Sequence, residues 1–276
     1  MIRLQDISYI FSNGYSAINQ LNMDIETNEF IAVMGRNGSG KSTLARLISG
    51  LLLPTSGSIE VDGYTIDKLQ NMQMIRRRVG LLLPSPDNQL IAGTVEQDIA
   101  FGPENLCLPS QEIHKRVDAA LAMVSMEDYR LDPPNLLSGG QKQLVCIAGL
   151  LAMQPQYMVL DELTSMLDPL MKKKIIKTIK ELHQSTGISF ILITHDLEEA
   201  IEADRIVLLE GGSIKVSASP KDLVTDINLL ESQGIQPLDI SIMTKILNHS
   251  PGMNLSPGLK YPKELVDEVC HLRLNK

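Results

Sequence analysis

The sequence lacks the features that mark disulfide-stabilised, membrane-spanning and nucleic-acid-binding proteins. Its three cysteines, Cys107, Cys146 and Cys270, are far apart and lack the spacing of metal ligands, so we expect reduced cysteines that serve packing. No apolar stretch approaches the ~18 residues of a membrane span. The longest candidate, Leu144 to Met153, has the length of a buried helix. The net charge of −8 argues against nucleic acid or an anionic membrane surface as the main partner.

The first residues, MIRLQDISYIF, contain no apolar signal core, which predicts a cytoplasmic protein whose membrane role would come through partners. A chain of 276 residues, 43% apolar and 21% charged, is enough for one large α/β domain or for one domain with a small appendage. The basic clusters at 76–78 and 172–174 are predicted to be solvated helix faces.

Hydrophobic periodicity predicts the fold class. Alternating or continuous apolar runs indicate strands, and apolar residues three and four apart indicate helices. The predicted order is strands at 2–11 and 16–26, a strand, glycine-rich turn and helix over 29–52, a strand at 57–66, helices within 110–152 interrupted at 131–140, a strand at 156–163, a helix at 169–183, a strand at 188–195, a helix at 196–203 and a hairpin at 205–218. This alternation indicates an α/β fold with a mostly parallel sheet covered on both faces, and an antiparallel β portion at the start.

The composition changes after Pro220. Residues 221–276 are rich in Pro, Gly and Ser between short helical runs. We interpret them as a small C-terminal appendage, with a loosely ordered tail as the alternative. The predicted domains are therefore 1–220 and 221–276.

Residues 35–42, GRNGSGKS, match the pattern of a phosphate-binding loop, G-x-x-x-x-G-K-[ST]. Several backbone N–H groups must meet the phosphate oxygens together, and glycine lets the chain approach them without a Cβ clash. The helix that begins near Lys41 adds its unpaired N–H groups and the positive end of its dipole. Lys41 would contact the β- and γ-phosphates, and the Ser42 hydroxyl would serve Mg²⁺.

Two acidic residues and a histidine follow buried strands. Asp161 and Glu162 stand where the strand 156–163 emerges, so one carboxylate can hold Mg²⁺ and the other can take a proton from the attacking water. His195 ends the next strand along the chain. Because the ends of neighbouring parallel strands open on the same crevice, a γ-phosphate-sensing role for His195 is reasonable.

A further strand ends abruptly in the stretch VGLLLPSPDNQL, Val79 to Leu90. Pro84 and Pro86 fix two φ angles, remove two backbone donors and push the residues before them towards extended geometry. The sequence therefore predicts a strand followed by a stiffened loop.

The motif LLSGGQKQ, Leu136 to Gln143, completes a set that resembles the ATP-binding cassette (ABC) ATPases. The order is phosphate loop, LSGGQ, apolar-Asp-Glu, SMLD, then a strand ending in His, and it covers about residues 1–220. Within that superfamily, SPDNQL, LSGGQKQ and TSMLDP are similar to the energy-coupling factor (ECF) transporter ATPases. The resemblance implies a P-loop NTPase of the ABC ATPase fold, with a helical signature subdomain at about 90–155.

The resemblance also implies roles for particular residues, with ATP and Mg²⁺ as cofactors. Glu162 would be the catalytic base, His195 would contact the γ-phosphate, and Asp161 would serve Mg²⁺. Phe11 would stack on adenine, although a core phenylalanine is the alternative. Asp168 would lie in the loop that crosses between subunits. The loop residues Gly35, Arg36, Asn37, Gly38, Ser39, Gly40, Lys41, Ser42 and Thr43 would hold the phosphates, and Ser138, Gly139, Gly140 and Gln141 would bind the ATP of the other subunit.

The implied partners are a second ATPase subunit in a head-to-tail dimer, a transmembrane scaffold and a substrate-binding membrane protein. A heterodimer is favoured over a homodimer, at the cytoplasmic face of the membrane and without nucleic acid. Such ATPases power uptake of vitamins or transition-metal ions.

The chain departs from the family pattern at several positions. Pro84 stands in place of a glutamine that would reach Mg²⁺ and the attacking water, and Ser85 in place of an asparagine. Leu144 replaces an arginine, and Leu163 replaces a small residue or proline. An ATP-binding regulatory partner with weak hydrolysis is therefore the alternative. A soluble ABC protein of DNA repair is disfavoured, because long coiled-coil or zinc insertions before LSGGQ are missing.

Overall fold

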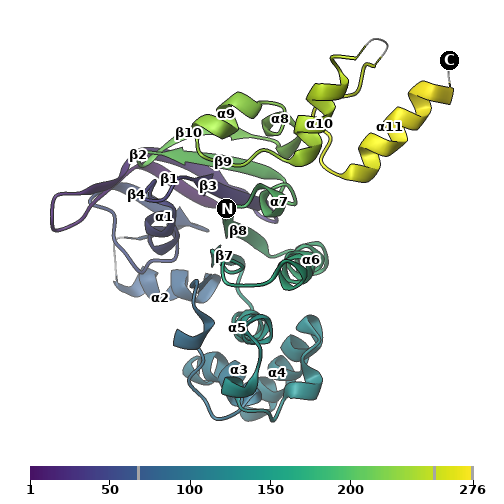
Figure 1. The fold of residues 1–276 in the computed structure, drawn as a ribbon. Helices are drawn as coiled ribbons and strands as arrows, with labels where there is room; N and C mark the ends of the chain where they lie inside the picture. The colour runs from purple at the N-terminus through teal and green to yellow at the C-terminus, as the bar shows by residue number, and fades with distance from the viewer. Residues whose placement is uncertain (67–68, 251–252, 275–276) are drawn as a thin grey trace.

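The computed structural model describes residues 1–66, 69–250 and 253–274 and contains two β-sheets (Figure 1). The smaller sheet is antiparallel and has the strand order β2-β1-β4-β5. Its strands are β1 (Ile2–Ile10), β2 (Ser16–Ile25), β4 (Ser56–Val61) and β5 (Tyr64–Thr65). The predicted antiparallel portion at the start of the chain is confirmed.

The larger sheet has six strands in the order β10-β9-β3-β8-β7-β6. The neighbours from β9 to β6 are parallel, and only the β9–β10 hairpin is antiparallel. The strands are β3 (Phe30–Gly35), β6 (Val79–Leu82), β7 (Tyr157–Asp161), β8 (Ser189–Ile193), β9 (Arg205–Glu210) and β10 (Ser213–Ala218). The mostly parallel sheet and the hairpin agree with the sequence prediction.

Both faces of the larger sheet are buried because successive side chains of a strand point to opposite sides. In β3, Phe30, Ala32 and Met34 belong to one hydrophobic core, whereas Ile31 and Val33 belong to the other. One core contains α1 (Lys41–Ile48) and the antiparallel sheet. The opposite core contains α5 (Gly139–Ala152), α6 (Pro169–Thr186) and α7 (Leu197–Ala200). The sheet therefore separates two helical layers.

A helical part extends from this second layer (Figure 1). It consists of α3 (Val95–Asn105), α4 (Ser110–Val124) and α5, which contact one another. Two short 3₁₀ turns, Glu127–Tyr129 and Pro134–Leu136, lie between α4 and α5. A further helix, α2 (Leu69–Arg78), precedes β6. Neither α2 nor α3 is among the elements predicted from periodicity.

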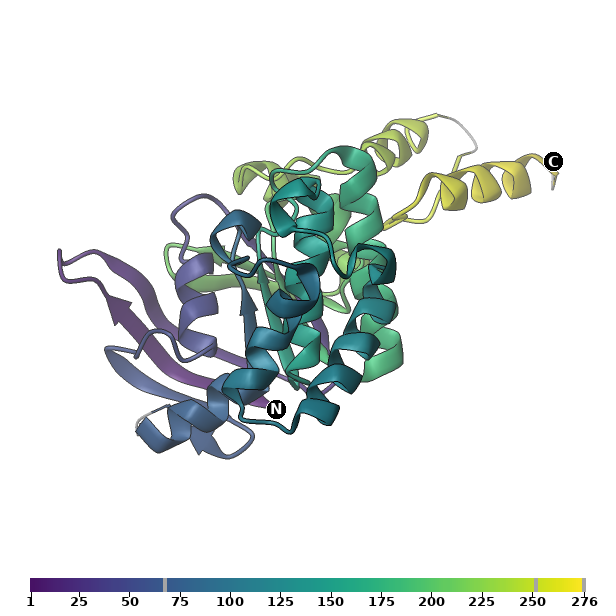
Figure 2. The ribbon, with the colours of Figure 1, turned by 90° about the horizontal axis from the view of Figure 1, so that it is seen from below.

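The residues after β10 form α8 (Pro220–Leu223), α9 (Ile227–Ser232), α10 (Asp239–Leu247) and α11 (Pro262–Leu274). The side chains of Leu223, Val224 and Leu230 join the core of the parallel sheet. Ile240 of α10 and Leu265 of α11 belong to the same core, although both helices project away from the sheets in both views (Figures 1 and 2). No helix in the described ranges is long and apolar enough to cross a membrane.

Several details differ from the sequence expectations. The predicted helix 196–203 is regular only over α7, and the helix predicted to end at 183 continues to Thr186. The Arg76 guanidinium donates to Gly50 O, and Arg78 lies over the Tyr64 ring, so this cluster is not simply a solvated face. All three cysteines are free thiols, but only Cys146 is half-buried, and the other two are exposed.

A half-buried carboxylate, Glu202, helps to hold the start of α11 against the rest of the chain. The Tyr261 hydroxyl donates to Glu202 Oε1 at 2.8 Å, and Lys180 Nζ lies 2.5 Å from Glu202 Oε2. Burial raises the pKa of Glu202, but the bonds from Lys180 and Tyr261 outweigh it and leave that pKa below its usual value. The depressed pKa means that this carboxylate contributes stability at neutral pH, which is lost as the pH falls through its folded-state pKa.

We predict that Tyr261→Phe lowers the free energy of unfolding by about 1 kcal/mol at pH 7, because it leaves a half-buried acceptor without one donor. The difference from the wild type should shrink in acid, where Glu202 is protonated. Urea unfolding at several pH values measures it, with Tyr129→Phe in the helical part as the control. A difference that grows in acid would contradict the assignment.

Candidate functional site

Three polar segments emerge at one edge of the parallel sheet because β3, β8 and β7 are neighbours in register. Val33 pairs with Ile193, and Ile193 pairs with Asp161. The loop after β3, the acidic pair after β7 and the histidine after β8 therefore open on the same crevice, as the sequence predicts for parallel strands.

The phosphate loop runs from the end of β3 into α1. Gly35 and Gly40 have φ of 149° and 103°, values that favour glycine. A Cβ on Gly35 would lie 2.3 Å from Leu209 O, and one on Gly40 would lie 2.4 Å from Ala17 O. Both glycines are thus required by conformation and by the close backbone behind them. Lys41 Nζ donates to Gly35 O at 2.8 Å and to Arg36 O at 3.1 Å, which holds the charge inside the loop.

The loop brings the buried ammonium of Lys41 close to two acids, the buried Asp161 and the half-buried Glu162. Burial lowers the pKa of Lys41, and the charges of Glu162 and Asp161 oppose that shift. Burial raises the pKa of Asp161, and the hydrogen bond from Ser42 opposes it. Ser42 Oγ donates to Asp161 Oδ1 at 3.2 Å. These two oxygens are ligands of the kind that Mg²⁺ prefers, so the pair fits a magnesium ion beside the phosphates.

Glu162 and His195 lie together at this edge, although the two side chains are not hydrogen-bonded. His195 Nδ1 is 4.0 Å from Glu162 Oε1, and the histidine is more exposed than the glutamate. Glu162 has φ of 47°, an uncommon value for a non-glycine residue, and its N–H donates to Ile193 O at 3.0 Å. The backbone therefore aims the Glu162 side chain into the pocket of the phosphate loop rather than along the strand.

The pocket contains an aromatic residue that the sequence reasoning missed. Tyr15 stacks on Phe11 with centroids 6.3 Å apart, and its hydroxyl donates to Gly38 O at 2.9 Å. The turn at Gly14 explains this, because Phe11 N–H donates to Tyr15 O and sets the two rings side by side. An aromatic residue four positions after Phe11, across a predicted turn, was the available signal. The pocket is lined by Tyr15, Ala17, Asn37, Gly38, Gly40, Lys41, Ser42, Thr43 and Glu162.

The signature turn lies on another helix. Ser138 caps α5: its hydroxyl accepts from Gln141 N, and the Gln141 side chain accepts from Ser138 N. The amides of Gly139 and Gly140 begin the helix and have no intrahelical acceptor. Asp168 caps α6 through Leu170 N and Met171 N. Because α5 and α1 pack in cores on opposite faces of the sheet, the signature turn and the phosphate loop begin helices in different layers.

The loop that begins at Pro84 is closed by Gln89. Its side chain bonds to both Leu83 N and Leu83 O, at 3.2 and 3.0 Å, and to Ser85 O at 3.0 Å. Lys142 Nζ lies 2.6 Å from Asp87 Oδ1 and so joins the loop to α5. The stiff loop predicted from the two prolines therefore contacts the helix of the signature turn.

The two unusual leucines are both core residues. Leu144 and Leu163 are buried and belong to the same hydrophobic core as the helical part. Leu144 therefore packs in the core where the family pattern has a charged arginine, and Leu163 packs there in place of a small residue or proline. Neither side chain lines the phosphate-loop pocket.

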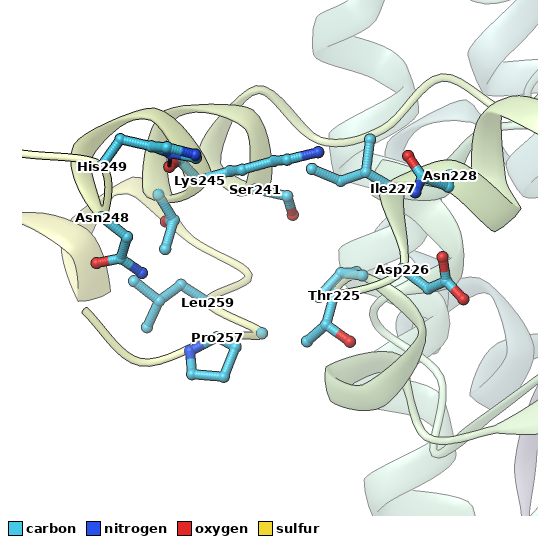
Figure 3. A pocket seen from close by; sticks show the side chains of 13 residues that line it. Thr225, Asp226, Ile227, Asn228, Ser241, Lys245, Asn248, His249, Pro257 and Leu259 are labelled. Atoms are coloured by element: carbon cyan, nitrogen blue, oxygen red, sulfur yellow. Dashed lines mark hydrogen bonds between the residues drawn. The ribbon is translucent and has the colours of Figure 1, made fainter. Parts of the chain in front are cut away.

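A larger cavity of about 370 Å³ lies between the C-terminal helices, and none of its lining residues belongs to the motifs above. Figure 3 shows Ser241 and Lys245 of α10 on one side and Thr225 and Ile227 on the other. Size alone would favour this cavity, but the grouped cation, acids and curled glycine backbone favour the smaller pocket for phosphate chemistry.

A parallel sheet with this loop, a lysine and a Ser–Asp pair at its edge defines a P-loop nucleotide-binding protein. The sequence pattern of the ABC transporter family matches residues 18–165, and the chain belongs to that family. It is an ATP-hydrolysing enzyme with the ABC ATPase fold.

The chain is similar over its whole length to proteins called energy-coupling factor transporter ATP-binding proteins. It is 48% identical to EcfA of Syntrophomonas wolfei over 98% of this chain and 99% of that protein. It is 42% identical to EcfA1 of Clostridium novyi, over 99% of each.

Among solved structures, cbiO1 from Clostridium perfringens, part of the ABC transporter complex cbiONQ, matches with a TM-score of 0.76 and 36% identity. That match covers 83% of this chain and 94% of cbiO1. The ATP-binding cassette MJ0796, a dimer bound to ADP and Pi, matches with a TM-score of 0.72 and 29% identity, over 79% of this chain and 98% of that one.

We predict that Gly40→Ala weakens ATP binding by about tenfold or more, because the strain of a positive φ and the contact with Ala17 O distort the loop. Titration with a fluorescent ATP analogue measures this. Gly149→Ala in α5 is the matched control, since its added Cβ meets open space and should leave binding unchanged. Equal affinities for the wild type and Gly40→Ala would contradict the assignment of the loop.

Proposed function

We propose that this chain is the ATPase subunit of an ECF-type importer, in which ATP-driven closure of an ATPase dimer powers uptake of a vitamin or a transition-metal ion. The observation that carries the proposal is the full-length similarity to ECF ATP-binding proteins, combined with the cation and acids grouped at one sheet edge. The chain works at the cytoplasmic face of the membrane, beside a transmembrane scaffold and a substrate-binding membrane protein.

The residues around the phosphate loop bind and cleave ATP. Lys41 and the loop amides hold the phosphates, and Phe11 stacks on adenine. Tyr15 stabilises both parts of the site, because its ring stacks on Phe11 and its hydroxyl donates to Gly38 O of the loop. Ser42 and Asp161 hold Mg²⁺, which neutralises charge on the β- and γ-phosphates when it is bound. The full phosphate set is Gly35, Arg36, Asn37, Gly38, Ser39, Gly40, Lys41, Ser42 and Thr43.

Glu162 acts as the base that takes a proton from the attacking water, and His195 contacts the γ-phosphate. The 4.0 Å between their side chains leaves each free to turn to its own target. Because catalytic hydrogen bonds commonly tighten only in the complex with substrate, this separation is compatible with both roles.

The second anion cradle serves another subunit. The separation of two layers supports this role, because α5 begins at the set Ser138, Gly139, Gly140 and Gln141 and packs in a different core from the helix of the phosphate loop. We propose a head-to-tail dimer with two ATP molecules at the interface, Asp168 in the crossing loop, and a non-identical ATPase as the favoured partner. Similarity to a dimeric cassette supports the dimer.

The chain is divided into an ATPase domain, 1–220, with a helical subdomain at about 90–155, and an appendage, 221–276, that supplies a second dimer contact. The projection of α10 and α11 away from the sheets supports this last role (Figure 2).

A specific observation favours a second candidate, an ATP-binding partner with weak hydrolysis. Pro84 has no side-chain amide to offer Mg²⁺ or water, and the nearby amide of Gln89 is engaged by Leu83 and Ser85. The loop can then transmit motion through the Asp87–Lys142 pair without taking part in the chemistry.

We predict that Pro84→Gln raises ATP hydrolysis in the assembled complex by roughly tenfold, because it restores a group that orients the attacking water. Phosphate release measures the rate. Ser85→Asn, the neighbouring departure, is the control and should change it little, whereas Glu162→Gln should abolish turnover. If Pro84→Gln leaves the hydrolysis rate unchanged while Glu162→Gln abolishes it, another residue orients the attacking water and our interpretation of Pro84 is wrong.

A further inference from the structure

A buried glutamate connects the loops that carry Glu162 and His195. Glu199 lies in α7 and is only 5% exposed. Its Oε2 accepts from the Thr194 hydroxyl at 2.6 Å, and its Oε1 accepts a short hydrogen bond from the Thr164 hydroxyl. Both threonines are buried as well. One carboxylate therefore bridges the loop after β7 and the loop after β8.

Each threonine is close in sequence to a residue of the proposed reaction. Thr194 immediately precedes His195, and its N–H donates to Val33 O at 3.2 Å, next to the phosphate loop. Thr164 follows Glu162 by two residues in a turn in which Ser165 N donates to Glu162 O at 3.1 Å. A shift of either threonine therefore displaces the backbone that carries Glu162 or His195.

The chemistry of the bridge suggests more than packing. Burying a carboxylate is costly unless its oxygens are hydrogen-bonded, and an apolar residue of similar volume would fill the space at lower cost. The Thr194 hydroxyl also accepts from Asp196 N at 3.0 Å, so the loop on the far side of His195 joins the same chain of hydrogen bonds. Such a connected network specifies one arrangement of both loops.

We propose that Glu199 is a positioning residue for ATP hydrolysis, which ties Thr164 to Thr194 and thereby sets the relative placement of Glu162 and His195. This inference rests on the proposed roles of those two residues. Glu199 does not touch ATP or water; it acts through the two threonine hydroxyls.

The test compares valine and serine at each threonine in the full-length chain, co-expressed with its partner subunits. Valine keeps the shape of threonine and removes the hydroxyl, whereas serine keeps the hydroxyl and removes a methyl group. Positioning predicts that Thr164→Val and Thr194→Val each lower kcat by about tenfold or more, since a misplacement near 1 Å can cost about 100-fold. KM for ATP should stay within about twofold, because the phosphate loop is untouched.

The serine variants should keep at least half of the wild-type kcat, and the valine double variant should fall no further than the lower single one, since one bridge is broken in each case. Rates are normalised to the folded fraction from thermal unfolding. Glu198→Gln, a change at an exposed neighbour, is the control and should behave as the wild type.

The outcomes separate this inference from the proposed function. Turnover that is lost in Glu162→Gln but normal in both valine variants overturns the inference alone. The opposite pattern, low kcat in serine and normal kcat in valine, indicates packing and also overturns it. Turnover that persists in Glu162→Gln overturns the proposed function and the inference with it.

Discussion

The parallel register of β3, β8 and β7 is the constraint on which the rest of the site depends. Both faces of this sheet are buried under hydrophobic cores, so the polar side chains of the site are placed at the ends of the strands. The pairing of Val33, Ile193 and Asp161 brings three such ends to one edge. Without that register, a lysine in one loop and acids in another would be separate, solvated charges.

Burial then shifts the pKa values of the lysine and the aspartate at this edge. Desolvation lowers the pKa of Lys41 and raises that of Asp161, and each charge partly offsets the shift of the other. The carbonyls of Gly35 and Arg36 accept hydrogen bonds from the Lys41 ammonium. A lysine beside carboxylates matches the proposed ligand, which carries both negative phosphates and a divalent cation.

Sequence patterns predicted the sheet, its strand ends and the phosphate loop because these depend on local periodicity and on glycine. The carboxyl ends of β7 and β8 are neighbours, as their order along the chain indicated. Contacts between distant segments were not predictable: the stacking of Tyr15 on Phe11, the Gln89 clamp on Leu83 and the Asp87–Lys142 pair. The burial of Glu199 was not predictable either, since a glutamate in a short helix is normally exposed to solvent.

The functional roles remain those that the family pattern suggests, and the structure gives them a physical frame. The phosphate loop and the signature turn begin helices in separate layers, which supports the proposal that each chain carries two halves of different sites. In the proposed assembly, a departure such as Pro84 would weaken the chemistry of one site and would leave the other half-site of the same chain available to a partner.

The central claim is that ATP joins the phosphate loop of one subunit to the signature turn of another. The most direct measurement is the molar mass in solution of the Glu162→Gln chain with its partner ATPase, with and without MgATP. The account predicts monomers or weak dimers without nucleotide and a stable dimer with MgATP, lost again in Ser138→Arg, which blocks the signature turn. Monomers under every nucleotide condition would contradict it.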